Sequence, residues 1–295
     1  MKILITGSNG FLGKLISAEL ENNNKILGLS RNSSNYKCSL EKEIPVFNDE
    51  FEVVIHAAGK AHSVPKTEIQ KKEFYEVNVL GTQNLLKGLE VSGVPKQFVF
   101  ISSVSVYGQE EGFNIAEDFP CAAKDAYGLS KIEAEILVSE WCKLHNVVCS
   151  ILRLPLLVGE NPPGNLGAMI SAIKRRYYFN IGGGKARKSM VLADDVAAFI
   201  PKIVAIGGIY NVTDGYHPTF FELSSAIAKQ FKKATPMNMP LFVAKVIGFF
   251  GNFLGNKAPI NSQKLKKITA DLTFDDNKAR SVGWKPRRVL DWFSI

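Results

Sequence analysis

Short apolar runs alternate with helical patterns over the first half of the chain. The apolar runs are four to six residues long and are bounded by glycine or polar residues, as strands of a buried sheet are. We predict strands at Lys2–Thr6, Lys25–Leu29, Val53–His56, Gln97–Ser102 and Val147–Leu152, and helices at Leu12–Leu20, Phe74–Leu89 and Tyr127–His145. This alternation implies βαβ units, so we predict an α/β protein with a doubly wound parallel sheet.

The second half of the chain breaks this rhythm. Chain breakers cluster at residues 162–164 and 182–184. The run Ser189–Leu192 followed by Asp194–Ile200 predicts a return to the main sheet with a flanking helix, and the chain from Phe220 onward is helix-rich. We therefore predict a dinucleotide-binding Rossmann domain of residues 1–160, with a return segment 187–212. A smaller, mostly helical substrate lobe is expected from residues 161–186 and 213–295.

A glycine-rich turn, TGSNGFLG, follows the first predicted strand. Gly7 suits a tight turn, Gly10 suits close approach of the backbone to a pyrophosphate, and Gly13 suits close packing of helix on strand. The helix beginning at Phe11 and Leu12 offers free N–H groups and a positive dipole to phosphate. An ordinary turn is the alternative, but the position directly between strand and helix favours dinucleotide binding.

The end of the second predicted strand bears on the choice of cofactor. Arg31 follows this strand, and no Asp or Glu lies between Gly28 and Tyr36. A carboxylate here would hold the ribose 2′-hydroxyl of NAD, whereas an arginine pairs with the 2′-phosphate of NADP. NADP(H) is therefore favoured over NAD(H). The alternative is an arginine that stacks on adenine without selecting the cofactor.

Three side chains suit proton transfer beside a hydride donor. Tyr127 and Lys131 are four residues apart, so a helix places both on one face. A nearby ammonium is expected to stabilise the Tyr127 phenolate and lower its pKa, and Ser103 at a strand end can bond the same substrate oxygen. We predict Ser103, Tyr127 and Lys131 as the catalytic trio of a hydride-transfer enzyme.

The composition of the chain limits which molecules it is expected to bind. The 295 residues are 46% hydrophobic and 22% charged, which excludes a disordered chain. The net charge is +8, but the basic residues form only short clusters, so an anionic substrate such as a nucleotide sugar is favoured over nucleic acid. The four cysteines lack paired or metal-ligand spacing, so we expect reduced thiols, a cytoplasmic protein and no metal.

The most apolar stretch spans residues 241–254 and contains Phe242, Phe249, Phe250 and Phe253. It is interrupted by lysine and glycine and is too short to span a bilayer, so we expect no stable membrane insertion. A helix packed in the lobe or in a dimer contact is favoured, with a membrane-surface role as the alternative, and a homodimer is left open. Because the chain begins directly with strand sequence, we expect no signal peptide.

Several motifs recur in a fixed order along the chain. They are TGSNGFLG, HAAG from His56, NVLGTQNLL from Asn78, SSVSVYG, YGLSK and RLPLLVG from Arg153. In this order and spacing they resemble the extended short-chain dehydrogenases/reductases, the NAD-dependent epimerase/dehydratase family. The resemblance covers nearly the whole chain and favours a branch of bacterial polysaccharide enzymes that reduce UDP-4-keto-6-deoxy sugars.

The resemblance implies further site residues. Those implied on the cofactor side are Ala57, Ala58, Gly59, Asn78, Pro155 and Val158, together with Tyr127 and Lys131. Those implied on the substrate side are Ser103, Tyr107, Asn165, Arg187 and Lys188. For Asn78 and His56 a structural hydrogen bond is favoured over chemistry. Ser39-Leu40 stand where relatives carry Asp-Leu for adenine, and the short stretch that follows predicts a missing helix.

The resemblance also bears on reaction type. The 4,6-dehydratases carry Asp-Glu at the catalytic strand end, where this chain has Val104 and Ser105. The expected function is therefore hydride chemistry on a UDP-sugar, namely reduction of a UDP-4-keto-6-deoxy-hexosamine at carbon 4 for bacterial surface polysaccharide synthesis. A UDP-hexose 4-epimerase with tightly held NAD is the alternative. A cofactor-binding regulator without turnover is a more distant one, because the tyrosine and lysine are both intact.

Overall fold

A seven-stranded sheet of order β11-β7-β5-β4-β1-β2-β3 forms the centre of the molecule. The computed structural model describes residues 1–32, 34–61, 65–253 and 261–294. The strands of the sheet are β1 (Lys2–Thr6), β2 (Lys25–Ser30), β3 (Tyr36–Lys37), β4 (Val53–His56), β5 (Gln97–Ser103), β7 (Val148–Leu154) and β11 (Gly208–Asn211). Every pairing within it is parallel, which confirms the predicted α/β class and its Rossmann-like sheet.

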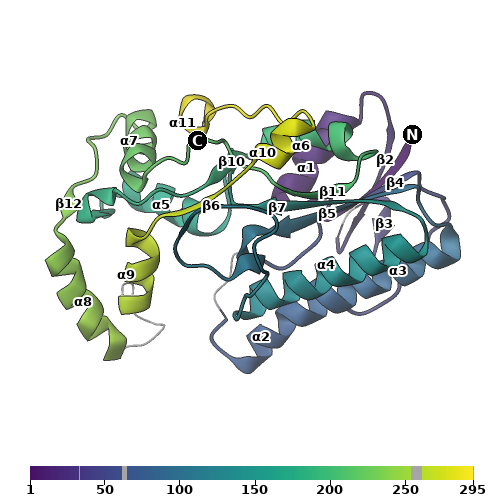
Figure 1. Ribbon diagram of the computed structural model, residues 1–295, viewed down its shortest axis with the longest axis horizontal. Coiled ribbons are helices and arrows are strands. Elements are labelled where there is room, and N and C mark those ends of the chain that lie inside the picture. Colours follow the sequence, from purple (N-terminus) through teal and green to yellow (C-terminus); the bar gives the residue numbers. More distant parts are fainter. Residues whose placement is uncertain (33, 62–64, 254–260, 295) are drawn as a thin grey trace.

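Helices cover both faces of this sheet (Figure 1). One face carries α1 (Phe11–Leu20), α6 (Ala193–Ile203) and α10 (Asn277–Ser281), and the other carries α2 (Glu68–Tyr75), the π-helical turn η1 (Glu76–Leu80), α3 (Gly81–Ser92) and α4 (Ala126–Leu144). Successive side chains of a strand point to opposite faces. Ile3 and Ile5 therefore join the core under α1 and α6, whereas Leu4 joins the core under α3 and α4.

The predicted absence of a helix between β3 and β4 is confirmed. Residues 38–52 contain only turns and irregular chain. Aromatic side chains fill the place of the helix: the Phe47 ring lies 5.1 Å from Tyr36 and 5.2 Å from Phe51, both edge-to-face. These contacts cover the edge of the sheet without a helix.

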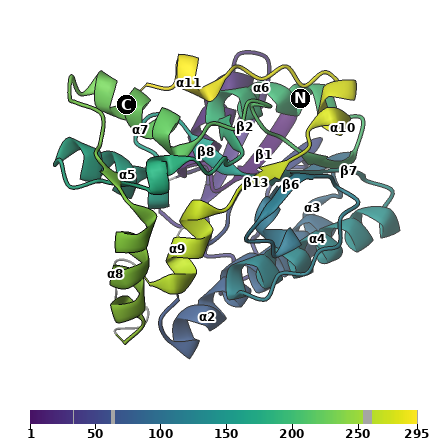
Figure 2. The same ribbon diagram turned by 60° about the vertical axis from the view of Figure 1, so that its left-hand side comes forward.

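Figure 2 shows the helices α5, α7, α8 and α9 together at one end of the molecule, apart from the helices that cover the sheet; several other elements lie outside the main sheet. The helical ones are η2 (Val104–Tyr107), α5 (Gly164–Lys174), η3 (Gly182–Gly184), α7 (Phe220–Gln230), α8 (Leu241–Phe253), α9 (Ser262–Thr269) and α11 (Val289–Trp292). The strands are β6 (Gly112–Ile115), β8 (Leu156–Val158), β9 (Asn180–Ile181), β10 (Met190–Leu192), β12 (Asn238–Met239) and β13 (Leu272–Phe274).

One expected strand pairing is wrong. The run Ser189–Leu192 was expected in the main sheet, but β10 pairs with β8 in a separate two-stranded sheet. The strand that returns to the main sheet is β11, which pairs with β7. An apolar run reveals that a strand is buried but carries no information about its partner, so the pattern could not distinguish the two sheets.

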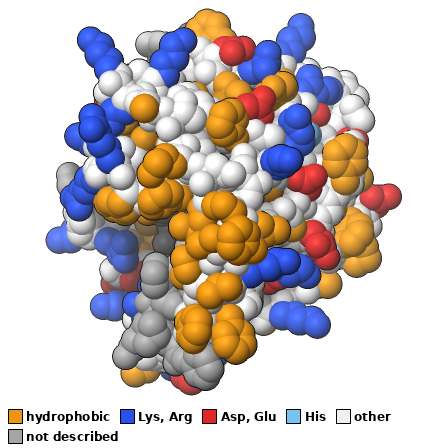
Figure 3. Space-filling view, turned by 90° about the vertical axis from the view of Figure 1, so that its left-hand side faces the viewer, with side chains coloured by type: hydrophobic (Ala, Val, Ile, Leu, Met, Phe, Trp, Pro, Cys, Tyr) orange, Lys and Arg blue, Asp and Glu red, His pale blue; other side chains and the backbone are white. Residues whose placement is uncertain are grey.

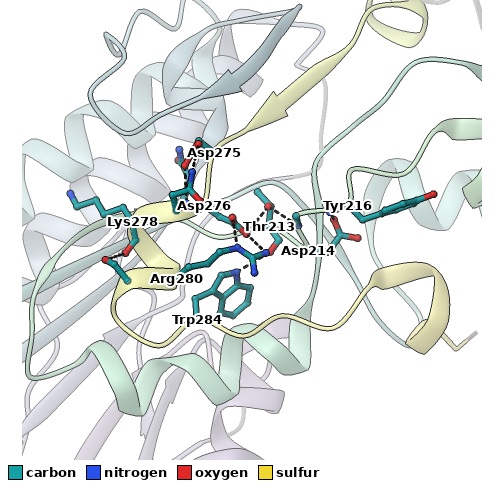
Figure 4. Close-up of polar contacts among 12 residues, drawn as sticks. Thr213, Asp214, Tyr216, Asp275, Asp276, Lys278, Arg280 and Trp284 are labelled. Atoms are coloured by element: carbon teal, nitrogen blue, oxygen red, sulfur yellow. Dashed lines mark hydrogen bonds and ion pairs between the residues drawn. The ribbon is translucent and has the colours of Figure 1, made fainter.

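The C-terminal tail folds back onto the Rossmann core (Figure 4). The indole Nε1 of Trp284 donates a hydrogen bond of 2.9 Å to the backbone oxygen of Thr213, and its ring lies 4.9 Å from Phe199. The Asp276 carboxylate accepts hydrogen bonds from the Thr213 hydroxyl at 3.0 Å and from Arg280 Nε at 2.7 Å. Part of the segment expected in the lobe therefore also contacts α6, which covers the main sheet.

Candidate active site

The strand order reverses between β1 and β4, and parallel α/β sheets bind ligands at such a point. Gly7 follows β1 with a φ of +67°, and a Cβ there would lie 2.8 Å from the backbone nitrogen of Ala58. The glycine-rich loop and the Ala57–Gly59 loop after β4 therefore touch. The structure brings these two sequence-predicted segments together at the expected place.

The start of α1 is built to receive an anion. A Cβ at Gly13 would lie 2.2 Å from the backbone oxygen of Gly7, so only glycine allows this close packing. No side chain caps the helix after Gly10, and its first turn contains no acidic residue. Among the described residues, the buried Ser8 hydroxyl has no hydrogen-bond partner. Free N–H groups, a positive dipole and this hydroxyl fit the diphosphate of a dinucleotide.

His56 at the end of β4 is structural. Its Nε2 lies 2.8 Å from the Thr82 hydroxyl, and its Nδ1 lies 2.6 Å from the Thr6 hydroxyl. Because Thr82 donates to the backbone oxygen of Asn78, the Thr82 oxygen accepts from His56, and Nδ1 accepts from Thr6. Burial lowers the pKa of His56 to about 3. The ring is therefore neutral and fixes the loop that follows β4.

Asn78 is held in the π-helical turn between α2 and α3. Its amide accepts a hydrogen bond from the backbone nitrogen of Lys60 at 2.7 Å, and donates to the backbone oxygen of Lys60 and to the Ser130 hydroxyl. These bonds join the chain after β4 to α4. The side chain is buried and engaged by protein, so we assign it to positioning Ser130 and not to direct cofactor contact.

The three proposed catalytic residues meet at the end of β5. Ser103 is the last residue of β5, and its side chain lies close enough to Tyr127, in the first turn of α4, to influence the pKa of that phenol. The Ser103 hydroxyl also donates to the Ser105 hydroxyl at 3.1 Å. Lys131 lies one helical turn beyond Tyr127, and its Nζ donates to the backbone oxygen of Ile101 at 2.7 Å.

The electrostatics of the trio differ from the expectation for Tyr127. Burial raises the pKa of its phenol, and the neighbouring Ser103 side chain lowers it by less. Burial also lowers the pKa of Lys131 to about 7, with Glu135 opposing this. The lysine therefore carries only part of its charge at neutral pH and does not produce the expected phenolate. Tyr127 stays protonated, which is the state of a proton donor.

A buried charge network that the sequence did not predict lies behind the trio. Glu135, one helical turn after Lys131, forms an ion pair of 2.7 Å with Arg153 of β7 and accepts a 2.5 Å hydrogen bond from the Ser102 hydroxyl. Arg153 Nη1 also donates to the Tyr107 hydroxyl at 3.0 Å. The sequence contained a signal for this network. Arg153 opens the apolar run RLPLLVG, Glu135 follows Lys131 by four residues, and a buried charge requires a partner.

Tyr107 does not face the expected substrate side. Its ring has no exposed surface, and its hydroxyl donates to Asn211 Oδ1 at 2.8 Å while accepting from Arg153. The ring stacks on Phe274 at 5.6 Å. Since every polar group of the side chain is used by protein, the expected contact with a sugar is corrected to a core contact.

The other site residues implied by the family resemblance differ in their exposure to solvent. Asn165 is exposed in the first turn of α5, Arg31 is exposed after β2, and Pro155 is half-buried. Val158 is fully buried in the lobe core, so only its backbone could meet a nicotinamide. That Val158 lies by the nicotinamide stays a prediction.

Arg187 and Lys188 are neighbours in the chain, but their side chains differ in their contacts with the rest of the protein. Arg187 Nη1 donates to the backbone oxygen of His217 at 3.0 Å, and its guanidinium lies 5.9 Å from the Tyr216 ring. Burial lowers the pKa of Lys188 to about 8, and Asp271 opposes this shift. A half-buried cation of this kind gains charge when an anion binds. Of the two, Lys188 is therefore the better candidate for a substrate diphosphate.

Several curated proteins are similar in sequence to this chain. Among curated proteins, the chain is 29% identical to N-acetyl-alpha-D-glucosaminyl-diphospho-ditrans,octacis-undecaprenol 4-epimerase of Escherichia coli O157:H7, over 96% of this chain and 89% of that protein. It is 29% identical to UDP-glucose 4-epimerase of Vibrio cholerae, over 98% and 92%. It is 26% identical to GDP-6-deoxy-D-mannose reductase of Pseudomonas aeruginosa, over 77% and 79%.

Solved structures support the fold. RMD from Pseudomonas aeruginosa, complexed with NADPH, superposes with a TM-score of 0.75 at 21% identity, over 98% of this chain and 94% of that one. UDP-glucose 4-epimerase of Thermotoga maritima, with UDP-glucose, gives 0.74 at 20% identity, over 97% and 94%. The model of the NAD dependent epimerase/dehydratase family matches residues 3–213. The chain therefore belongs to that family, as its motifs indicated.

Proposed function

We propose that this protein reduces a UDP-4-keto-6-deoxy-hexosamine at carbon 4 with NADPH, in the synthesis of a bacterial surface polysaccharide. The observation that carries the proposal is the end of β5, where Ser103 reaches Tyr127 and where Val104 and Ser105 replace the two carboxylates of a dehydratase. In this proposal residues 1–160 and 187–212 bind the cofactor, residues 161–186 and 213–295 bind the sugar, and the protein acts in the cytoplasm.

The mechanism follows from the protonation states of the trio. When bound, NADPH supplies a hydride to the carbon 4 carbonyl. Tyr127, whose pKa is raised by burial, gives its proton to the oxygen of that carbonyl. Ser103 orients the same oxygen by a hydrogen bond, and Lys131 holds the ribose and gains full charge as phosphate and phenolate charge develop nearby.

The proposed cofactor preference rests on Arg31. The residue is exposed at the end of β2, where the 2′ substituent of the adenosine ribose reaches the second strand of a Rossmann sheet. A guanidinium there favours a 2′-phosphate. That RMD is complexed with NADPH agrees with this preference, although the two UDP-glucose 4-epimerases from Thermus thermophilus and Bifidobacterium longum are complexed with NAD or NAD+.

Epimerisation at carbon 4 is the second candidate. It is favoured by the relatives from Escherichia coli and Vibrio cholerae, both of which are 4-epimerases. An epimerase needs Tyr127 first as a base and then as an acid, so a phenol held protonated favours the one-way reduction.

One experiment separates the candidates. Purified protein is incubated with NADPH and UDP-4-keto-6-deoxy-N-acetylglucosamine, and in a second reaction with UDP-N-acetylglucosamine and catalytic NAD, with products read by NMR. We expect loss of nicotinamide absorbance and a 4-hydroxyl product in the first reaction and no change in the second. Interconversion of a UDP-hexose with its 4-epimer and no net change in absorbance would establish the epimerase instead.

A further inference from the structure

The helix α8 (Leu241–Phe253) buries small residues and exposes large apolar side chains, which is the reverse of what is usual for a helix at the surface. Its buried residues are Ala244, Gly248 and Gly251; Ala244 packs with Leu265 of α9, and Gly248 lies beside Ser262 at the start of α9. Three of its phenylalanines point outward, with exposed fractions of 70% for Phe242, 59% for Phe249 and 63% for Phe250. A helix that serves only the protein core buries its large apolar side chains and exposes its small ones.

The exposed side chains continue beyond α8. Gly182 of η3 lies beside Leu241, Gly184 lies beside Phe221, and β12 before α8 pairs with β9. The members of this surface, called the α8 face, are Phe179, Phe221, Met237, Phe242, Val246, Ile247, Phe249 and Phe250, all of them exposed. Figure 3 shows apolar side chains gathered at this end of the lobe, and Figure 1 shows α8 projecting from it. Contiguous apolar surface of this kind marks a contact site.

The chain around α8 is rich in basic residues, of which Lys266 and Lys267 of α9 form ion pairs with Glu111 and Glu110. The two lobe segments 161–193 and 223–270 contain 14 Lys and Arg and no Asp or Glu. The rest of the chain then has 22 Lys and Arg against 28 Asp and Glu, so the positive charge is concentrated in the lobe. Lys245 on α8 and Lys185 after η3 are exposed beside the apolar side chains. Within these two segments, the short basic clusters of the sequence are not offset by acids.

We propose that the α8 face docks onto an anionic lipid bilayer. Aromatic and aliphatic side chains would enter the boundary between head groups and acyl chains, while the lysines lie against lipid phosphate, which is the pattern of an interfacial helix. Within the described residues no helix is long and apolar enough to cross a membrane, so the contact is peripheral. The relative from Escherichia coli agrees with this site, because its name describes a substrate linked to undecaprenol, a lipid.

The test is sedimentation of the full chain with sucrose-loaded vesicles of phosphatidylcholine, with and without phosphatidylglycerol. We expect binding only with phosphatidylglycerol, weakening as salt is added. The double variant Phe249→Ser/Phe250→Ser should reduce the partition coefficient about tenfold or more. Lys245→Gln should reduce it about fivefold. Leu144→Ser, which removes an exposed apolar side chain from the far end of α4, is the matched control and should change nothing.

Circular dichroism melts should show the variants folded, because the changed side chains are exposed. Equal binding by the wild type and the double variant, or no binding to phosphatidylglycerol vesicles, overturns the proposal. The competing occupant is a second copy of the chain: a dimer in sedimentation velocity that the double variant loses, without vesicle binding, would also overturn it. None of these measurements needs turnover, so the proposal fails or stands separately from the proposed reaction.

Discussion

The Nζ of Lys131 donates a hydrogen bond of 2.7 Å to the backbone oxygen of Ile101. This contact joins α4 to β5 two residues before Ser103, and the ammonium also lies 4.1 Å from the Phe100 ring centre. The side chain is buried, and burial outweighs the attraction of Glu135, so the pKa of Lys131 falls to about 7. Burial thus destabilises the charged form of Lys131 in the protein without ligand.

That cost predicts a pH-dependent stability. The folded-state pKa of Lys131 is about 7 and the ordinary value is 10.5, so the unfolded chain binds more protons between these two values. The contribution of Lys131 to the free energy of unfolding therefore rises with pH from 7 to 10.5 and is least favourable below 7. Lys131→Met should be more stable than wild type at pH 6. In urea titrations the difference should shrink by roughly 2–3 kcal/mol at pH 9. A constant difference would show that the ammonium is not buried.

Tyr127→Phe tests the proton donor. The variant keeps the ring, which lies 5.9 Å from Phe74, and removes only the hydroxyl, so it should fold and bind cofactor normally. Turnover should fall about 10²–10⁴-fold, because a positioned acid contributes that much. Rates are measured by nicotinamide absorbance and binding by cofactor fluorescence. Tyr75→Phe, at an exposed tyrosine, is the control and should keep full activity. Near-normal turnover in Tyr127→Phe would contradict the mechanism.

Glu135→Ala tests the charge network behind the trio. It leaves the buried Arg153 guanidinium without its carboxylate partner, which typically costs about 3–5 kcal/mol. Urea unfolding followed by tryptophan fluorescence measures the loss. Glu133→Ala on the exposed side of the same helix should stay within about 0.5 kcal/mol of wild type. A small effect of Glu135→Ala would mean that solvent reaches Arg153.

The sequence predicted the strands and helices of the Rossmann half, because their residues repeat with the period of each element. It could not place Tyr107, because the motif around this residue does not say whether the ring points to the core or to the substrate. Here Arg153 and Asn211, 46 and 104 residues away, bond its hydroxyl. The pKa of Tyr127 was mispredicted for a similar reason, since burial depends on the packed site and not on the spacing of Tyr127 and Lys131.

Arg31→Asp tests cofactor choice. Replacing the guanidinium by a carboxylate repels a 2′-phosphate and offers an acceptor to a 2′-hydroxyl, so the preference should change from NADP(H) to NAD(H). Titration calorimetry with both cofactors measures it. Arg31→Lys keeps the charge but loses the bidentate fork and should retain a weaker preference for NADP(H). Equal or tighter NAD(H) binding by the wild type would remove Arg31 from the proposed selectivity.

The last prediction concerns a reaction that this site should not perform. Dehydration across a sugar ring needs a base to take a proton from carbon 5 and an acid to expel the hydroxyl at carbon 6. The two positions after Ser103 hold Val104, which has no ionisable group, and Ser105, whose hydroxyl accepts a hydrogen bond from Ser103. A serine hydroxyl is too weak an acid and base to replace a carboxylate. With UDP-N-acetylglucosamine and NAD, NMR should therefore show no 4-keto-6-deoxy product. The double variant Val104→Asp/Ser105→Glu supplies the missing groups and is the comparison. Formation of the keto-sugar by the wild type would show that another residue provides the acid and base.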